Sequence, residues 1–277
     1  MPAGRRIPSV QSLKLVKPFR HSEYRRLVTA LAVSVVGAGM WTVVLPMQVL
    51  EMHDDALALS LVATCLGTAA VVAALVGGVI ADRFPQRRII LAVQTLNFAT
   101  LVVIAPLAAF DVLRLWELAV AATVVGMGAG LFAPAFSAYL PRLLPERELV
   151  AANGIDGVMR STLQQALGPT LAGVLLGATY PDTGLVIIAV LYGLSLLLLI
   201  TLRPSPSAPV AASTGSSPWA DLSDGIRLVL RTRWLRSCLG ATAVTAFAVA
   251  GPVEVLLPYL TQQHFHDGPL AFGAIVA

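Results

Sequence analysis

The chain has 277 residues, of which 57% are hydrophobic and 12% are charged, and its mean hydropathy is +0.79. Soluble domains carry about 25% charged residues, so this composition excludes an ordinary soluble fold. A net charge of +4 would fit a nucleic-acid-binding protein, but the basic residues lie in short loops and at the ends of apolar runs, as in membrane proteins.

Six apolar segments, each long enough to cross a bilayer, precede residue 203. About 20 apolar residues at about 1.5 Å per residue span the roughly 30 Å hydrocarbon core. The segments cover residues 27–50, 57–81, 89–110, 118–140, 149–178 and 183–202. We therefore predict an all-α integral membrane protein with a six-helix N-terminal bundle.

The composition changes after the sixth segment. Residues 203–218 are rich in Pro, Ser, Ala and Thr, which predicts a flexible linker. Residues 219–236 place apolar side chains on one helical face, which predicts a helix on the membrane surface. A seventh segment covers residues 237–261, and an eighth begins near Leu270. The predicted regions are an N-terminal segment (1–26), the bundle (27–202), a linker (203–236) and the start of a second bundle (237–277).

The distribution of bases predicts the orientation. If the N-terminus is cytoplasmic, 17 of the 19 Lys and Arg residues lie on the cytoplasmic side, whereas Arg114 alone is outside and Arg160 lies within a span. Because cytoplasmic loops carry the excess of bases, we expect a cytoplasmic N-terminus, residues 51–56 and 262–268 outside, and a location in the plasma (inner) membrane.

The turn between the second and third segments is crowded with charge. From Gly78 it reads Gly-Val-Ile-Ala-Asp-Arg-Phe-Pro-Gln-Arg-Arg, ending at Arg88, and the adjacent Gly77 and Gly78 make room for a neighbouring helix. Such a turn can be an orientation signal alone, since cytoplasmic loops are basic in any membrane protein. It also resembles the signature loop between the second and third helices of the major facilitator superfamily. The matching residues are Gly78, Asp82, Arg83 and Arg87.

The turn departs from the family pattern at two positions. Pro85 stands where a glycine is usual, and Gln86 stands where a base is usual. The Phe-Pro variant is most similar to the branch of drug and siderophore exporters. The resemblance implies that Asp82 and Arg83 act as a latch between conformations. Because Arg87 and Arg88 carry the same charge, we expect that Arg88 can substitute for Arg87.

The fifth segment contains a second resemblance. Residues 168–173 read Gly-Pro-Thr-Leu-Ala-Gly, which is similar to the Gly-Pro, two residues, Gly-Gly motif that exporters of this superfamily carry in the fifth helix. The residues carried over are Gly168, Pro169 and Gly173. A proline kink beside small residues lets another helix approach closely. Ordinary small-residue packing would give the same pattern.

The second half repeats the first faintly. Residues 38–46 align without gaps on residues 250–258, which indicates that the seventh segment is the counterpart of the first. Together with the motifs, this implies a secondary active transporter, a proton-driven exporter of drug-like or siderophore-like small molecules that works by alternating access. A complete member has twelve spans, so the chain is expected to be partial. The alternative is a non-transporting membrane module, such as a sensor or an assembly partner.

Three ionisable residues lie within the predicted spans. Glu254 in the seventh segment is costly to expose to lipid, and low dielectric favours its protonated form, which suits a carrier that binds and releases protons. It could also be a structural acid or a contact for a cationic substrate. Asp156 and Arg160 are four residues apart, in the favourable order for an ion pair, and Arg160 could extend to the lipid headgroups.

The sequence does not indicate an enzyme. Ser, His and acidic residues do not combine at a useful spacing, and no phosphate-binding loop is present. His264 and His266 fit a solvated loop better than a metal site. We therefore expect no cofactor and no metal. The expected partners are the bilayer, a small-molecule substrate and protons, but no nucleic acid.

Overall fold

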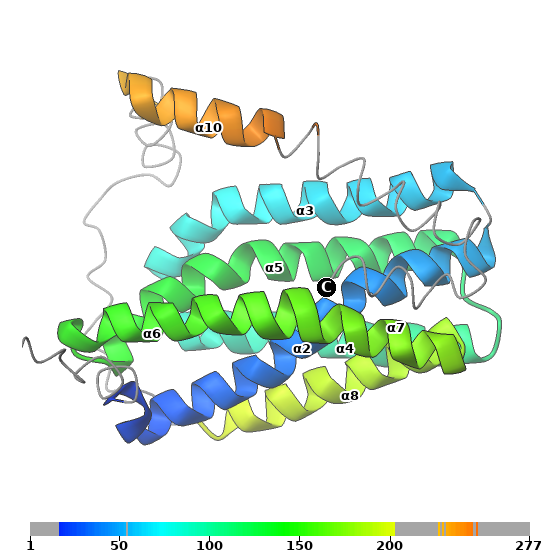
Figure 1. The fold of residues 1–277 in the computed structure, drawn as a ribbon, viewed down its shortest axis with the longest axis horizontal. Coiled ribbons are helices and arrows are strands. Elements are labelled where there is room, and N and C mark those ends of the chain that lie inside the picture. Colours follow the sequence, from blue (N-terminus) through cyan, green and yellow to red (C-terminus); the bar gives the residue numbers. More distant parts are fainter. Residues whose placement is uncertain are drawn as a thin grey trace, which may run out of the picture.

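The structure is a computed structural model, and it describes residues 17–53, 55–202, 227, 229, 231–245 and 248 (Figure 1). Every regular element in this part of the chain is a helix. The elements are η1 (Lys17–Arg20), α2 (Ser22–Met52), α3 (Ala56–Arg83), α4 (Gln86–Ala109), α5 (Leu115–Leu143), α6 (Glu146–Met159), η2 (Arg160–Leu167), α7 (Gly168–Ala178), α8 (Pro181–Ile200) and α10 (Arg233–Thr245).

The prediction of an all-α membrane protein is confirmed. Among the described residues, five helices are long and apolar enough to cross a membrane, namely α2, α3, α4, α5 and α8. The predicted fifth segment corresponds to α6, η2 and α7, which follow one another without a gap in the chain, and we call these three elements the fifth span. The division of the chain after residue 202 stays a prediction, because residues 203–226 lie outside the described residues.

The helices extend beyond the apolar runs that predicted them. α2 begins at Ser22 and not at Leu27, α5 continues to Leu143, and α6 begins at Glu146. The sequence predicts a charged loop at residues 141–148, between the fourth and fifth segments. This prediction is wrong for most of the range, since only residues 144 and 145 lie between the two helices. The length of an apolar run reflects the thickness of the hydrocarbon core. A helix can continue into the polar residues beyond it, because its ends are set by the backbone hydrogen bonds.

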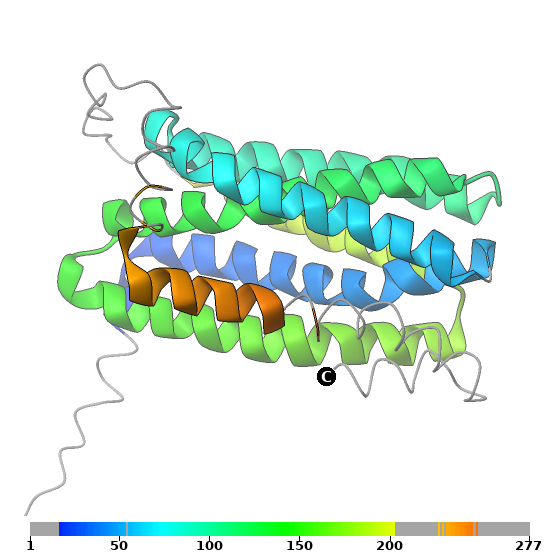
Figure 2. The same ribbon diagram turned by 90° about the horizontal axis from the view of Figure 1, so that it is seen from above.

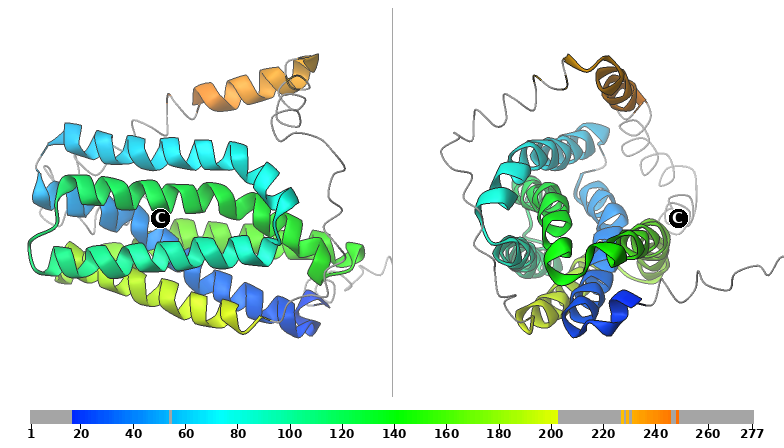
Figure 3. Two further views of the ribbon diagram at one scale, coloured as in Figure 1. Left: turned by 180° about the vertical axis from the view of Figure 1, so that it is seen from behind. Right: turned by 90° about the vertical axis from the view of Figure 1, so that its left-hand side faces the viewer.

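The spans pack side by side in an order that differs from their order in the chain. α3 packs on α5, α5 on α4, α4 on α8, and α8 on α2, which in turn packs on η2 and α7. Figure 2 and the end-on view in Figure 3 show this arrangement, with α10 outside the bundle. Helices α2 and α5 also touch, and both contribute to the wall of a polar hollow in the bundle.

Two apolar clusters form the core of the bundle. The first contains Val44, Leu101, Leu118 and Ile188, and the second contains Leu27, Ile90, Leu140 and Leu199. Between the two clusters lies a layer that includes the polar residues Ser34, Gln94 and Asn97. Asn97 lies at the middle of α4, so this polar layer is at about half the height of the bundle.

Candidate functional site

Gln86 connects the two ends of the charged turn through a hydrogen bond. It occupies the position at which the pattern described above has a basic residue. The Gln86 side-chain amide donates a hydrogen bond of 2.7 Å to the carbonyl of Ala81, and the side chain is 4% exposed. This carbonyl belongs to the last turn of α3, where helices leave carbonyls without internal partners. Asp82, Arg83 and Arg88 are exposed around it.

Arg87 connects the turn to a different helix. Its Nη2 donates to the carbonyl of Ile200, the last residue of α8, at 3.3 Å. Arg26 of α2 donates to the next carbonyl, that of Thr201, at 3.2 Å. Cations stabilise helix C-termini, where carbonyls and the negative end of the helix dipole meet. Arg87 and the exposed Arg88 therefore differ in their contacts, while the expectation that Arg88 can substitute for Arg87 as a positive charge in transport stays a prediction.

The two glycines before the turn differ in their surroundings. A Cβ added at Gly77 would lie 2.9 Å from Cγ of Pro134 on α5, whereas one added at Gly78 would meet no described atom within 4 Å. Farther along α5, Gly126 and Gly130 face the backbone carbonyls of Leu66 and Ala70 on α3. The close approach predicted for this part of α3 is thus made by Gly77 and not by Gly78.

The exporter-like motif begins where a π-helix ends. The N–H of Gly168 donates to the carbonyl of Leu163, five residues earlier, and α7 follows with Pro169 near its start. A Cβ at Gly168 would lie 2.6 Å from Cα of Gly39 on α2. Gly168, Pro169 and Gly173 are buried. The small residues therefore allow α2 and the fifth span to touch at their backbones, while a role for this motif in transport stays a prediction.

The predicted ion pair in the fifth span is present. Arg160 donates through Nε to Oδ2 of Asp156 at 3.0 Å. Arg160 is also the first residue of η2 and lines a hollow in the bundle. Its guanidinium is thus held by its own helix at the edge of that hollow.

The hollow lies in the polar layer and has a volume of about 220 Å³. Its wall comes from α2, α3, α4, α5, η2 and α8. The polar side chains in the wall include Ser34, Trp41, Gln94, Asn97, Arg160 and Gln164. Sequence reasoning missed this group except for Arg160. The available signal was the pair Gln94 and Asn97, the two amide side chains of a largely apolar run, whose spacing of three residues places both on one face of α4.

Hydrogen bonds tie one side of the hollow together. The hydroxyl of Ser34 donates to Oε1 of Gln94 at 3.1 Å, and Nε2 of Gln94 donates to the carbonyl of Tyr192 at 3.2 Å. On the same two helices, Nε1 of Trp41 and Oδ1 of Asn97 are buried and have no hydrogen-bond partner among the described residues. The polar residues of the hollow are therefore bonded in part, with Gln94 bonded at both ends of its amide and Asn97 unbonded at its oxygen.

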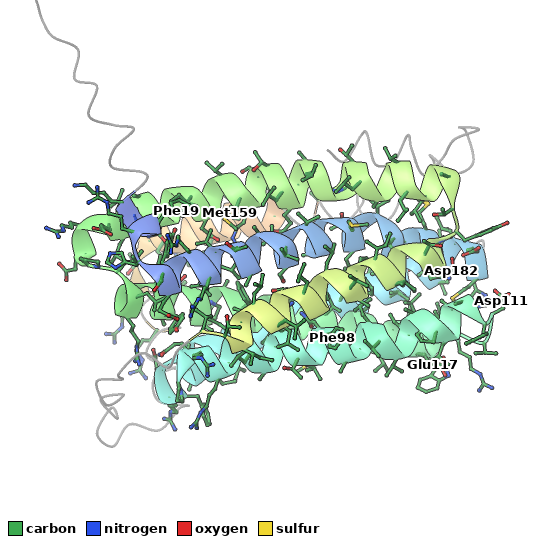
Figure 4. All side chains as sticks on the ribbon, turned by 90° about the horizontal axis from the view of Figure 1, so that it is seen from below. Phe19, Phe98, Asp111, Glu117, Met159 and Asp182 are labelled. Atoms are coloured by element: carbon green, nitrogen blue, oxygen red, sulfur yellow. The ribbon has the colours of Figure 1, made fainter. Side chains whose placement is uncertain are left out.

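Acidic residues gather at the end of the bundle opposite to the charged turn. Figure 4 shows Asp111, Glu117 and Asp182 at that end, and Phe19 and Met159 toward the other. A wider hollow of about 810 Å³ lies there and includes Glu51, Asp111 and Asp182 in its wall. Within the described part of the chain, no group of three or more His, Cys, Asp or Glu side chains could hold a metal ion.

Some predicted residues lie outside the described part of the chain. These are Glu254, the pair His264 and His266, and the beginning of the eighth segment. Their roles stay predictions.

Comparisons with known proteins agree with the family that the charged turn resembles. The sequence profile of the Major Facilitator Superfamily matches residues 27–277. The chain is 28% identical over 259 residues to the enterobactin exporter EntS of Salmonella typhimurium, with 90% of this chain and 58% of the relative covered. It is 29% identical over 259 residues to the multidrug efflux pump Tap of Mycobacterium tuberculosis, with 89% and 60% covered. The chain thus spans about three fifths of the length of these relatives.

Proposed function

Because the chain belongs to the major facilitator superfamily, we propose that the protein is a secondary active transporter that exports drug-like or siderophore-like small molecules in exchange for protons. The observation that carries the proposal is the match over residues 27–277 together with relatives named as exporters. The plasma membrane is the proposed location, with the N-terminus in the cytoplasm.

The polar hollow in the bundle supports a substrate site. It lies at about half the height of the membrane-spanning helices and combines aromatic walls with a few polar groups, as small-molecule sites do. Transporters of this kind bind substrate near the bilayer midplane, where their two halves meet. We propose that this hollow is the part of the substrate site that the N-terminal half provides.

The charged turn supports alternating access. Asp82 is exposed at the end of α3, while Gln86 and Arg87 fix the shape of the turn and attach it to α8. A rigid turn that presents an exposed carboxylate can pair with a base of the second half in one conformation and release it in the other. Each state is then stabilised by different contacts, as a conformational switch requires.

Proton coupling is assigned to Glu254. A carboxylate within a span is a functional candidate by default, because its charge is costly in lipid. The pair Asp156 and Arg160 is a second candidate, although its 3.0 Å contact favours a permanently charged pair over a group that exchanges protons.

The test uses everted membrane vesicles that contain the full chain and a dye, ethidium. With an imposed pH gradient, acidic inside, we expect ethidium to accumulate in the vesicles and to leak out when a protonophore removes the gradient. Vesicles without the protein are the control. Ethidium, a siderophore and a neutral drug should be compared. Accumulation of none of them above the control would contradict the proposal and favour a non-transporting membrane module.

A further inference from the structure

An open groove lies between α4 and α5 on the surface of the bundle. It has a volume of about 430 Å³, and its wall runs from Ala99 to Leu107 on α4 and from Trp116 to Val124 on α5. None of its described wall residues lines the polar hollow. Val103, Trp116 and Val120 in the wall are 60%, 61% and 53% exposed. Side chains so exposed on two membrane-spanning helices meet the lipid.

The described beginning of the second half of the chain leaves this groove uncovered. α10 lies beyond α3 in Figure 1, and the end-on view in Figure 3 shows α4 on the opposite side of the bundle from α10. The groove between α4 and α5 therefore faces away from α10.

The groove fits an acyl chain in length and in chemistry. From Ala99 to Leu107, α4 rises about 12 Å at about 1.5 Å per residue. One leaflet contributes about 15 Å of hydrocarbon, half of a core of about 30 Å. The wall is largely apolar along this length, and the hydroxyl of Thr100 already donates to the carbonyl of Leu96 at 2.8 Å. An acyl chain in the groove therefore leaves this hydroxyl paired.

Trp116 and Glu117 mark the end of the groove at the membrane surface. Tryptophan is enriched at the interface between lipid and water, and Figure 4 shows Glu117 at the same end of the bundle as Asp111 and Asp182. Oε2 of Glu117 accepts a hydrogen bond of 3.0 Å from the backbone N–H of Arg114, which holds the carboxylate at the beginning of α5. Because a carboxylate has about four acceptor sites, it can also accept from a lipid headgroup.

The charges at this end select the kind of headgroup. The acidic residues gathered here repel an anionic lipid. A primary ammonium group can donate a charge-assisted hydrogen bond to Glu117 and can lie against the ring of Trp116. A quaternary ammonium has no N–H to donate. Arg114, three residues before Glu117, can pair with the phosphate of the same lipid.

We propose that this groove binds a phospholipid whose headgroup carries a primary ammonium. Its acyl chain lies along α4 and α5, and its ammonium group is bound by Glu117. In the proposed orientation this lipid belongs to the outer leaflet. The site goes beyond the proposed export function, because its occupant is a component of the membrane and not the exported molecule.

The test uses Trp116 as a reporter of its own lipid contacts. The sequence has four tryptophans, so the full chain with Trp41→Phe, Trp219→Phe and Trp234→Phe retains Trp116 alone. This parent is reconstituted in phosphatidylcholine vesicles in which a rising fraction of one lipid carries a dibrominated acyl chain, which quenches tryptophan emission on contact. We expect half-maximal quenching by brominated phosphatidylethanolamine at a mole fraction at least threefold lower than for brominated phosphatidylcholine or phosphatidylglycerol.

Two pairs of variants provide the comparison. Glu117→Gln retains an acceptor for the N–H of Arg114 but loses the charge, and should abolish the preference for the ethanolamine lipid. Asp182→Asn makes the same charge change at the same end but outside the groove, and should retain the preference. Ala99→Phe fills the groove and should raise the half-maximal mole fraction at least threefold. Val102→Phe, exposed on α4 outside the groove, should leave it unchanged. Equal melting temperatures separate lost binding from misfolding.

Equal quenching by the three brominated lipids, stronger quenching by phosphatidylglycerol, or an unchanged preference in Glu117→Gln would overturn the proposal. A lack of quenching by any of the lipids would show that another part of the chain covers the groove, and would overturn it as well. The ethidium assay on the same vesicles keeps the two proposals apart. A selective lipid site without transport would contradict the export function alone, and transport without lipid selectivity would contradict the lipid site alone.

Discussion

The side-chain amide of Gln86 donates a 2.7 Å hydrogen bond to the carbonyl of Ala81, across the turn between α3 and α4. A glutamine at this position thus fixes the end of one span to the beginning of the next. A lysine has the same capacity to donate to a helix C-terminal carbonyl.

Substitutions of Gln86 should therefore show whether its hydrogen bond or the shape of its side chain stabilises the turn. Gln86→Leu loses the bond, and we expect the free energy of unfolding to fall by about 0.5–1.5 kcal/mol. Gln86→Lys should lose less, since it retains a donor. Thermal unfolding in detergent measures both, with Arg88→Gln at the exposed neighbouring position as the control. Equal losses for Leu and Lys would contradict the role of the hydrogen bond.

Arg87 and Arg88 should behave differently although they carry the same charge. Arg87→Ala removes the contact with the carbonyl of Ile200 and should cost about 1 kcal/mol, as cations at helix C-termini contribute about 0.3–1 kcal/mol or somewhat more when partly buried. Arg88→Ala should cost little. Melting temperatures and ethidium transport of the two variants provide the measurement, and identical effects would show that only net charge matters.

Asp82→Asn should affect transport more than folding. The Asp82 side chain is exposed, so its replacement leaves membrane insertion and the melting temperature unchanged. If Asp82 stabilises one conformation through a base of the second half, its loss removes a coupling energy of about 1–3 kcal/mol, and we expect transport to fall about tenfold. Asp82→Glu should retain most of the rate. Wild-type transport by Asp82→Asn would contradict the latch.

Two glycines of the fifth span offer a matched pair of substitutions. Gly168→Ala places a Cβ 2.6 Å from Cα of Gly39 and must separate two backbones, which should cost about 1–3 kcal/mol. Gly157→Ala meets no described atom within 4 Å and should stabilise α6 by up to about 1 kcal/mol through helix propensity. Opposite shifts in melting temperature are the expected result. A harmless Gly168→Ala would contradict the observed contact with α2.

Glu254→Gln tests the proposed coupling residue. Glutamine retains the shape and much of the hydrogen bonding of glutamate but cannot exchange a proton. We expect the variant to bind substrate and to lose gradient-driven accumulation, while Glu254→Asp retains partial activity with a shifted pH optimum. Loss of binding of cationic substrates alone would identify Glu254 as a counter-ion. Full proton-coupled transport by the Gln variant would make it a structural residue.

The sequence predicted the spans and the short-range pairs better than the contacts between helices. Asp156 and Arg160 could be paired from their spacing, because four residues make one helical turn. The contact between Gly39 and Gly168 could not be predicted, because an almost uniformly apolar helix does not indicate which face meets which neighbour. The bond between Arg87 and Ile200 was missed for a related reason. The acceptor is a backbone carbonyl, which every residue has.

The π-helix η2 sets the rotational phase of the fifth span. Each α-helical residue advances the chain by about 100° around the axis, at 3.6 residues per turn, and a π segment accommodates an extra residue in a turn. Returning Arg160–Leu167 to α-helical bonding would therefore rotate α7 relative to α6 by about this angle per residue absorbed. The direction in which the side chains of α7 point, relative to those of α6, therefore depends on the π-helical segment between them.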